Sequence, residues 1–264
     1  MILPILAIIS MPIEPLSGSG SIYVFDILGP SSDPICIHAE TYDLGLAELL
    51  EGEEADVVCI DGQDSAQSHA EISVLISDTQ FRPEMSGWGD AVAGEGQTAF
   101  SRHDTSGGVT FNVYEPVRVR LNWFMWAAGL GNANMTLRRV GDIDGPTVPF
   151  PPIFEQTVSS YIEPIQIDDI TMFTMRTGRW RVSMFSTHQA MNTKKGFMNG
   201  FARGTFEGTW IDLGDVDGSG NVDLTDLLDV IASWGLCGSC AADVTGDGYV
   251  DTSDLLQVIA DWSG

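Results

Sequence analysis

Two acidic segments near the end of the chain carry oxygen-bearing side chains at the spacing of a calcium-binding loop. The first, DVDGSGNVDLTDLLDVIASWG, starts at Asp215, and a near copy, DVTGDGYVDTSDLLQVIADWSG, starts at Asp243. Calcium takes six to eight oxygen ligands, and a tightly turned twelve-residue loop can aim the oxygens of positions 1, 3, 5, 7, 9 and 12 at one ion. Two copies in the same register therefore predict two calcium ions.

Each copy supplies a set of candidate ligands in this register. In the first copy they are Asp215, Asp217, Ser219, Asn221, Asp223 and Asp226. In the second copy they are Asp243, Thr245, Asp247, Tyr249, Asp251 and Asp254. Position 7 contributes its backbone carbonyl, and glycine at position 6, Gly220 or Gly248, permits the sharp turn. Two metal-free Asp-Gly turns are the alternative, but the carboxylates clustered in each copy would then repel one another.

A helical pattern follows each loop, and the two patterns match residue for residue. Leu227, Leu228, Ile231 and Trp234 of the first copy repeat as Leu255, Leu256, Ile259 and Trp262 of the second. This spacing predicts two amphipathic helices. Val222 and Val250, at position 8, are expected to pack between the paired loops. The two repeats should therefore share one small core.

This segment resembles a type I dockerin, a calcium-binding module of two loop-helix repeats that each lack the entering helix of an EF-hand. The family pattern fits from Asp215 to Leu228 and again from Asp243 to Leu256, within about the last fifth of the chain. The resemblance implies that the loop residues are calcium ligands. It also implies that loop positions 10 and 11 help to choose a cohesin partner; these are Leu224, Thr225, Thr252 and Ser253.

The resemblance leaves two uses for the module. Family members that dock to cohesins often have a basic pair in the helix, where this chain has Ile231-Ala232 and Ile259-Ala260. The module is therefore expected either to attach the chain to a cohesin-like or cell-envelope protein, or to stabilise its end as a calcium clasp. Ser219 and Thr245, which replace carboxylates, indicate moderate calcium affinity.

The charge balance limits the classes of partner. The chain has 12 basic and 37 acidic residues and a formal net charge of −25, and residues 215–264 contain no lysine or arginine. Nucleic acids and anionic membrane surfaces are bound through basic side chains, so neither is an expected partner. No segment reaches the roughly 18 apolar residues of a membrane span.

Residues 21–211 read as short strands separated by Gly, Pro, Asn and Asp, which predicts a mainly β fold, an antiparallel β-sandwich or jelly roll. In residues 117–126, apolar residues alternate with Arg118, Arg120 and Asn122. Further strands are expected at residues 70–77, 107–114, 135–140, 170–176, 180–186 and 205–211. The one expected helix of this domain is residues 43–54, and turns are expected at Gly131-Asn132 and Thr177-Gly178. Residues 212–264 form the predicted second domain.

Residues 1–20 form a candidate signal segment. MILPILAIISMP has about the length of a signal-peptide core, although no basic residue precedes it. A buried strand at Ile2 to Ile9 is the alternative. We expect a protein that is secreted or displayed at the cell surface.

Four cysteines, Cys36, Cys59, Cys237 and Cys240, permit two disulfides. Cys237 and Cys240 form a C-x-x-C between the two repeats, which can be a redox centre, half of a zinc site or a small disulfide staple; we favour the staple. Cys36 and Cys59 lie in strand-like sequences and are expected to bridge two strands. Buried free thiols are the alternative for that pair.

The sequence contains none of the catalytic motifs that short spacings can identify. G-x-S-x-G, H-E-x-x-H and phosphate-binding glycine loops are absent, and the scattered histidines and acidic pairs define no site. We therefore lean away from an enzyme. Trp123 and Trp126 either form a platform for stacking sugars or belong to a strand buried on both sides.

These observations favour a non-catalytic extracellular sandwich whose terminal module attaches or stabilises it. A carbohydrate-binding or polysaccharide-degrading protein carried by a dockerin is the alternative. A third hypothesis is a structural component of a cell envelope or matrix.

Overall fold

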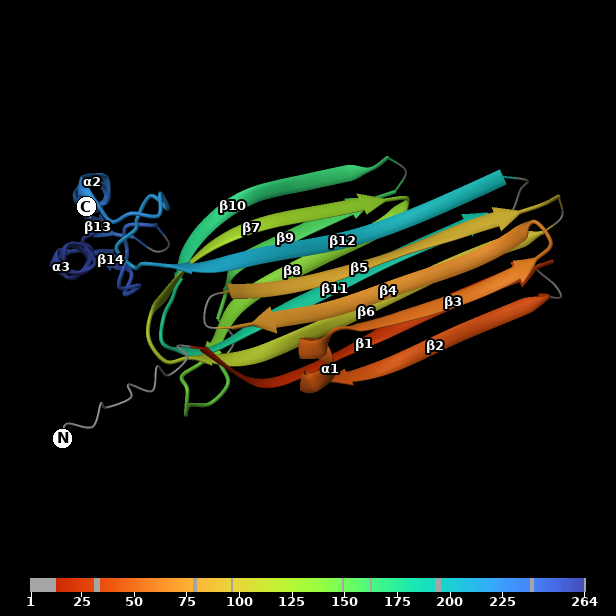
Figure 1. Cartoon of the computed structure of the whole chain (residues 1–264), viewed down its shortest axis with the longest axis horizontal. Coiled ribbons are helices and arrows are strands. Elements are labelled where there is room, and N and C mark those ends of the chain that lie inside the picture. Colours follow the sequence, from red (N-terminus) through yellow and green to blue (C-terminus); the bar gives the residue numbers. More distant parts are fainter. Residues whose placement is uncertain are drawn as a thin grey trace, which may run out of the picture.

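The computed structural model describes residues 13–30, 34–77, 80–95, 97–148, 150–161, 163–192, 196–237 and 240–263. In this part of the chain, two six-stranded antiparallel sheets pack face to face, and a small helical module lies at one end of them (Figure 1). The predicted antiparallel sandwich followed by a helical module is thereby confirmed. The apolar N-terminal stretch at residues 1–12 lies outside the described residues.

Sheet A has the spatial order β2 (Cys36–Gly45), β1 (Ile13–Gly29), β6 (Thr98–Val113), β11 (Gly178–Asn192), β8 (Leu130–Gly141) and β9 (Pro152–Ser160). Sheet B has the order β10 (Ile165–Met175), β7 (Val117–Ala128), β12 (Gly196–Ile211), β5 (Gln80–Ala93), β4 (Asp64–Ile76) and β3 (Glu53–Asp61). Strands close in sequence often lie in opposite sheets, so the fold depends on contacts between distant segments.

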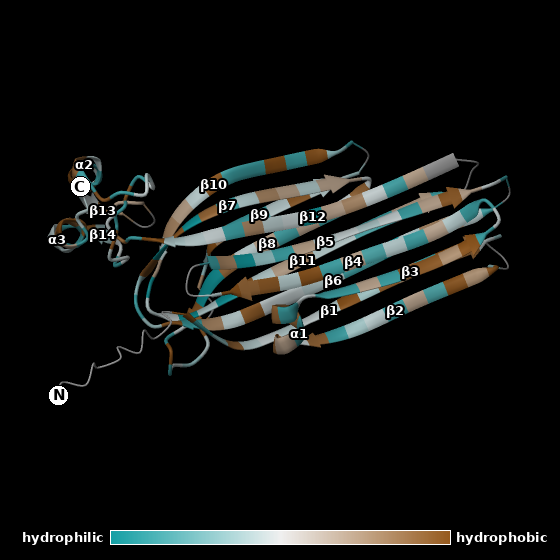
Figure 2. Ribbon diagram, viewed as in Figure 1, coloured by the Kyte–Doolittle hydropathy of each residue, from teal (hydrophilic) through white to brown (hydrophobic). Residues whose placement is uncertain are grey.

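Strand formation follows the alternation of apolar and polar residues, which Figure 2 shows as brown and teal bands along many strands. On β7, Val119, Leu121 and Met125 are fully buried, while the residues between them point to the outer face of sheet B. Successive side chains of a strand point to opposite faces, so this pattern commits one face to the core. The inward residues of both sheets form one large apolar core that includes Phe81, Phe111 and Phe206.

Several predicted bounds differ from the structure. Strand β1 begins at Ile13, so residues 13–20 of the candidate signal segment belong to a strand of the sandwich. The expected helix at residues 43–54 is only α1 (Leu46–Glu51), because the flanking residues pair in β2 and β3. The tight turn before β8 is at Gly129, whose φ is +64°, and the predicted turn residues Gly131-Asn132 lie inside the strand. The domain boundaries at residues 21–211 and 212–264 remain predictions.

A polar band crosses the middle of the sandwich between the large apolar core and a smaller alanine-rich one. His103 of β6 and His188 of β11 are both fully buried, and their Nδ1 atoms are 3.0 Å apart. Glycines of the opposite sheet make room for the rings: a Cβ atom on Gly87 would lie 2.4 Å from His103, and one on Gly200 would lie 2.1 Å from His188. These positions therefore require glycine.

Burial controls the ionisation of this band. Loss of solvent lowers the pKa of His103 well below its usual value and lowers that of His188 to about 4. Burial also raises the pKa of Asp26, which accepts a hydrogen bond from Ser68, to about 7. The histidines are consequently neutral at neutral pH, and Asp26 retains a proton over much of the acidic range.

A disulfide joins the two sheets at one side of the sandwich. Cys36 of β2 and Cys59 of β3 are bonded, with their Cα atoms 5.8 Å apart. The two strands are edge strands of opposite sheets. The bridge therefore joins the two sheets covalently at edge strands that are not paired with each other.

The terminal module contains α2 (Leu224–Ala232), β13 (Gly235–Leu236), β14 (Tyr249–Val250) and α3 (Thr252–Ala260). Its core consists mainly of valines from both repeats, with Val222 and Val250 buried in it as position 8 of the loops predicts. Among the described residues, no helix combines the length and apolar character that crossing a membrane requires.

Candidate calcium-binding module

Both acidic segments fold into the same loop. At position 6, Gly220 has φ +92° and Gly248 has φ +95°, a conformation that side-chain-bearing residues rarely adopt. The turn brings the position 6 amide back onto position 1. Gly220 N donates to Asp215 Oδ2 at 3.0 Å, and Gly248 N donates to Asp243 Oδ2 at 2.9 Å. The first acid of each loop is thus fixed by the loop itself.

The last acid of each loop closes it from the helix that follows. Asp226, on the first turn of α2, accepts hydrogen bonds from the amides of Val216, Asp217 and Asp223. Asp254, on the first turn of α3, accepts from the amides of Thr245 and Asp251. Both carboxylates are fully buried. Position 12 therefore connects the start, the end and the helix of each repeat.

Position 9 caps the following helix in both repeats. Asp223 Oδ1 accepts from Thr225 N at 2.7 Å, and Asp251 Oδ1 accepts from Ser253 N at 2.7 Å. A carboxylate at a helix N-terminus satisfies amides that have no partner within the helix. One oxygen of this side chain is therefore used for the helix cap, which leaves the other to face a ligand.

The donor set fits a hard cation. Ligand atoms of Asp215, Asp217 and Asp226 all lie within 4.8 Å of one another. Asp215 Oδ1 and Thr245 Oγ1 are buried and have no hydrogen-bond partner in the described structure. Burial raises the pKa of Asp215, and the neighbouring Asp226 and Asp217 raise it further. A divalent ion would supply the missing partner and offset this repulsion.

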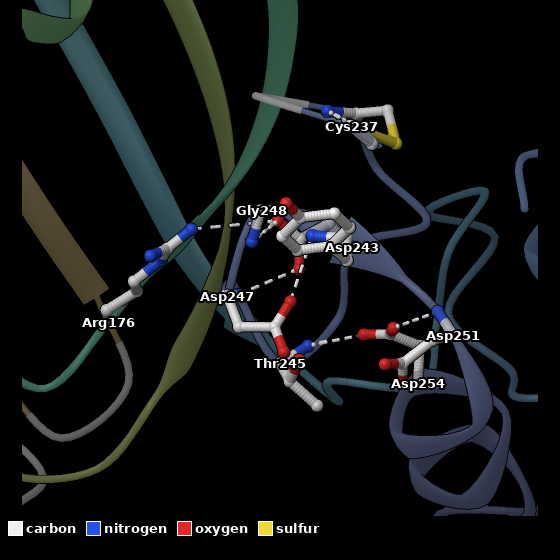
Figure 3. A network of polar contacts seen from close by, with 10 residues as sticks. Arg176, Cys237, Asp243, Thr245, Asp247, Gly248, Asp251 and Asp254 are labelled. Atoms are coloured by element: carbon white, nitrogen blue, oxygen red, sulfur yellow. Dashed lines mark hydrogen bonds and ion pairs between the residues drawn. A yellow bond between two sulfur atoms is a disulfide. The ribbon is translucent and has the colours of Figure 1, made fainter. Parts of the chain in front are cut away.

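The second loop uses the same geometry with a rearranged donor set; Figure 3 shows its polar contacts. Asp243 accepts from the amides of Asp247 and Gly248, and burial is the main cause that raises its pKa. Thr245 replaces the carboxylate that the first loop has at position 3, Asp217. Asp247 Oδ1 accepts from Tyr249 N at 2.9 Å. The second loop thus has its carboxylate at position 5, where the first loop has Ser219, so each loop has four carboxylates at its ligand positions.

Residues at positions 5 and 7 lie at the open side of each loop. In the first loop, Ser219 Oγ donates to Asn221 O at 3.2 Å, and both residues are exposed. In the second loop, Asp247 and Tyr249 are also exposed. The side chain of Tyr249 points to solvent at position 7, where only the backbone carbonyl is expected to bind calcium.

The two repeats support each other across a pseudo-symmetric arrangement. The segment after α2 pairs with the second loop, Leu236 opposite Tyr249. The segment after α3 returns to the first loop, where Ser263 N donates to Val222 O at 3.1 Å. The bonded Cys237 and Cys240 lie in the connector, and Cys237 N donates to Gly248 O. Each loop is consequently held by the segment that follows the helix of the other repeat.

The outer faces of the two helices differ from the expected core pattern. Val230 and Val258 are the buried apolar residues of α2 and α3, whereas most of the repeated apolar residues point outward. These outward residues and Leu224, which is not repeated, form the apolar stripe, which continues two residues past the end of each helix. It consists of Leu224, Leu228, Ile231, Trp234, Leu256, Ile259 and Trp262, each between 42% and 59% exposed. Thr225, Thr252 and Ser253, predicted to contact a partner, are exposed beside it.

Sequence reasoning missed the arginines of the sandwich that contact the loops. Arg118 of β7 is fully buried and donates to the carbonyls of Val216 and Ala241, and Arg120 donates to Gly218 O. Arg176 Nη2 lies 3.7 Å from Asp243 Oδ2 (Figure 3). Arg118 and Arg120 alternate with apolar residues, which correctly places both on the outer face of sheet B. Nothing local in the sequence indicates that the module covers this face.

The predicted stacking pair points to opposite faces of sheet B. Trp123 is only 8% exposed, donates through Nε1 to Thr171 Oγ1 and packs on Phe154, so it is a core residue and its proposed stacking role is wrong. Trp126 lies on the outer face, with its ring centroid 4.5 Å from that of Phe201. Phe201 is opposite Trp88 in the ladder, and Trp88 stacks on His69. These four residues form an aromatic row across sheet B.

Comparison with known proteins identifies the module. Residues 213–261 match the model of the Dockerin type I domain family, so the chain carries a type I dockerin domain at this position. No curated protein matches the chain. Dockerin type I domains generally bind calcium and act as attachment modules.

Solved structures add no information on function. A GH31 alpha-xylosidase from Xanthomonas citri is 6% identical with a TM-score of 0.15, over 62% of this chain and 34% of that chain. The infectious bursal disease virus Gx strain structure is 8% identical with a TM-score of 0.13, over 75% of this chain and 66% of that chain. The chain thus spans about a third of the xylosidase and just under two thirds of the viral chain, and neither likeness supports a conclusion.

Proposed function

We propose that the type I dockerin domain at residues 213–261 attaches the β-sandwich to a cohesin-bearing partner outside the cell or at its surface, and that it does so with two calcium ions bound. The observation that carries this proposal is the apolar stripe on α2 and α3. Helix residues that could have entered the module's core are exposed instead. Exposed apolar residues gathered on one small module are a common feature of protein-protein interfaces.

The two-fold repetition of the stripe supports a helix-based docking surface. Leu228 of α2 corresponds to Leu256 of α3, and Ile231 corresponds to Ile259. Either helix can therefore present a similar set of apolar contacts to a partner. The residues at loop positions 10 and 11 flank this surface at the start of each helix, so they are placed to add polar selectivity.

Calcium would act on this surface through the helices. Asp226 and Asp254 are both loop residues and first-turn residues of α2 and α3, so an ion bound at each loop would fix the helix that carries the stripe. The ligands are the twelve loop residues named above. In this proposal, the metal does no chemistry; it compensates the carboxylates and orders the docking surface.

The sandwich is, in this proposal, the non-catalytic part that the module attaches. Its titratable groups with strongly shifted pKa values, His103, His188 and Asp26, are buried inside the sandwich. A group that acts on a substrate has to reach it. Extracellular placement agrees with two disulfides, which persist in oxidising surroundings.

A second candidate function is carbohydrate binding by the sandwich, and the aromatic row favours it. Trp126, Phe201, Trp88 and His69 lie on the outer face of four neighbouring strands. Aromatic rings offer flat apolar faces on which sugar rings stack. Arg203 and Glu84, joined at 2.9 Å, lie beside the row and offer hydrogen-bonding groups. Loss of soluble-glycan binding in Trp126→Ala, with Trp123→Phe as the buried control, would support this function.

The attachment proposal is tested with the full chain on a sensor surface and recombinant type I cohesin domains in solution. Binding is expected with calcium and not with chelator. The double variant Leu228→Asp and Leu256→Asp is expected to abolish binding, because both helices lose an apolar contact. Ile60→Asp, at a 68% exposed apolar residue of the sandwich, is the matched control and should bind like the unchanged chain. Binding that survives the double variant would exclude the stripe as the docking surface.

A further inference from the structure

The module docks on its own sandwich through its loops. Arg118 lies on the outer face of sheet B, between the inward residues Val117 and Val119, yet its side chain is fully buried because the module covers it. Its Nη1 donates to Ala241 O at 2.6 Å and its Nη2 donates to Val216 O at 2.9 Å. An arginine buried outside the sandwich core thus binds two main-chain carbonyls of the module through its two Nη atoms, while its buried Nε has no hydrogen-bond partner in the described structure.

These two carbonyls belong to different repeats. Val216 is position 2 of the first loop, and Ala241 lies just before the first ligand of the second loop, Asp243. A guanidinium has a rigid planar fork of donors, so one side chain fixes both carbonyls relative to each other. Arg120 adds a hydrogen bond to Gly218 O at 3.2 Å, at position 4 of the first loop. The contacts therefore hold the backbone of the ligand-bearing segments.

Close packing at position 4 supports the same arrangement. A Cβ atom on Gly218 would lie 2.3 Å from the sulfur of Met172, and one on Gly246 would lie 2.8 Å from Cγ of Arg176. Both neighbours belong to β10 or to the residue that follows it. Position 4 of each loop thus lies against the sandwich. A side chain at this position would collide with Met172 in the first loop and with Arg176 in the second.

The connection between the two parts is short and ordered. Strand β12 ends at Ile211, and Gly214 N donates to Asp261 Oδ2 at 3.0 Å, so the linking residues are held against the end of α3. The apolar stripe is on exposed helix faces, while the loops contact the sandwich (Figure 1). The docked module can consequently present the stripe to a partner.

We propose that Arg118 is a positioning residue for both calcium sites: by holding one carbonyl from each repeat, it keeps the two loops in their ligand-binding shape, so that docking on the sandwich and calcium binding strengthen each other. This inference rests on the proposed calcium binding of the module. Arg118 forms no hydrogen bond to a predicted ligand atom, but its charge interacts with Asp215, Asp226 and Asp217. That charge by itself opposes a calcium ion, so the proposed support comes through the two carbonyls. Linkage requires the effect to be reciprocal, so calcium also strengthens docking.

Arg176 provides an internal contrast. Its guanidinium pairs with Asp243, a predicted ligand of the second loop, at 3.7 Å. A cation beside a ligand carboxylate competes with calcium for it and does not shape the loop. Removal of Arg118 should therefore weaken calcium binding, whereas removal of Arg176 should leave it equal or tighter. A role based on charge alone would move both variants in the same direction.

The experiment is a calcium titration of the full chain by calorimetry. Arg118→Met is expected to raise the calcium Kd roughly 5- to 50-fold, the range of ordinary coupling between sites. Arg118→Lys keeps the charge and one donor group, so its calcium Kd should lie between the values for Arg118→Met and the unchanged chain. Arg181→Met is the matched control, because Arg181 lies on the outer face of sheet A and contacts Ser183 instead of the module. Its Kd should not change.

A second measurement reads docking directly. Amide hydrogen exchange of residues 212–218 and 241–246 should slow when calcium is added to the unchanged chain, and this protection should be largely lost in Arg118→Met. Near-ultraviolet circular dichroism of the sandwich aromatics reports whether that variant still folds. If it does not, Arg120→Gln loses the single hydrogen bond to Gly218 O and is expected to raise the Kd about 2- to 5-fold, at the lower end of coupling effects.

The outcomes separate the inference from the proposed function. Equal calcium Kd and equal protection in Arg118→Met and Arg181→Met would overturn the positioning role while calcium binding stands. Equal weakening by Arg118→Met and Arg176→Met would also overturn it, because the loss would then not depend on the two carbonyl contacts of Arg118. Equal tightening would overturn it too, because removal of a cation near the loops would explain both. No calcium uptake by the unchanged chain would overturn the proposed calcium binding and this inference with it.

Discussion

The sandwich and the dockerin module reach their folds by different balances of forces. The sandwich has a large apolar core, a disulfide between its sheets and a buried histidine pair that is neutral at neutral pH. The module has a small valine core and a set of crowded carboxylates. Small cores contribute little stability, and modules of this size commonly depend on metals. Metal removal should therefore act mainly on the module, and acid should act on the sandwich through its buried titratable groups.

Chelation tests the comparison most strongly. Removal of calcium leaves the carboxylates of both loops uncompensated, so residues 215–263 are expected to lose most of their exchange protection and their helical signal. The sandwich should keep its near-ultraviolet signal, because its core contains no part of the loops. Hydrogen exchange in chelator measures both regions in one sample. Full protection of α2 and α3 in chelator would show that the module folds without metal.

Asp215→Ala separates the two loops. Asp215 is the buried first ligand of the first loop and accepts the Gly220 amide, so its loss should remove one calcium site. The second site should persist with reduced affinity, because the two repeats share the valine core. Calorimetry counts the sites that remain. Two unaltered sites in this variant would contradict the ligand assignment, and Asp229→Ala, an acid of α2 outside the loop positions, is the control.

Removal of the disulfide probes the sandwich alone. Cys36 and Cys59 are 23 residues apart, and a crosslink that closes a loop of this length typically contributes about 3 kcal/mol. The Cys36→Ser, Cys59→Ser double variant should lower the unfolding free energy of the sandwich by this order and leave calcium affinity unchanged. Urea denaturation in saturating calcium measures the first quantity. A loss of calcium affinity in this double variant would mean that the sandwich and the module are more strongly coupled than expected.

Acid should destabilise the sandwich through its buried histidines. Their folded pKa values lie below the ordinary 6.5, so the unfolded state binds more protons and stability is lost as pH falls from about 6.5 to about 4. Asp26 opposes this, because its raised pKa stabilises the fold at low pH and that contribution is lost as pH rises from 3.8 to about 7. Two histidines against one carboxyl leave a net slope of about 1.4 kcal/mol per pH unit.

Asp26→Asn isolates these opposing effects. The variant removes the carboxyl but keeps a group of similar size, so the loss of stability on acidification should become about twice as steep. Urea denaturation between pH 4 and 6.5 in saturating calcium gives the slope. The acid Asp104, which raises the pKa of His188, is unchanged in both proteins. An identical slope in the two proteins would show that Asp26 does not titrate in this window.

The sequence predicted local patterns better than contacts between distant segments. The loop register was readable because it depends on ligand types at fixed spacing, and the alternation on residues 117–126 was readable because a strand commits one face to the core. The short α1 was misjudged because its flanking residues pair with β1 and β4, a tertiary preference that overrides local pattern.

Other features follow only from the assembled fold. Trp123 and Trp126 are three residues apart and so point to opposite faces, but which face was covered depended on the second sheet. The apolar stripe had the spacing of a core face, yet the shared core of the two repeats takes Val230 and Val258 instead. Arg118 gave no local signal, because its partners Val216 and Ala241 are about a hundred or more residues away.

The calcium stoichiometry of the full chain tests directly whether the module folds around metal ions. It is measured by native mass spectrometry after chelation and stepwise return of calcium. We predict uptake of two calcium ions, with recovery of exchange protection in α2 and α3 over the same range of calcium concentration. A chain that takes up no calcium while both helices stay protected would contradict the claim that the module folds around its metal ions.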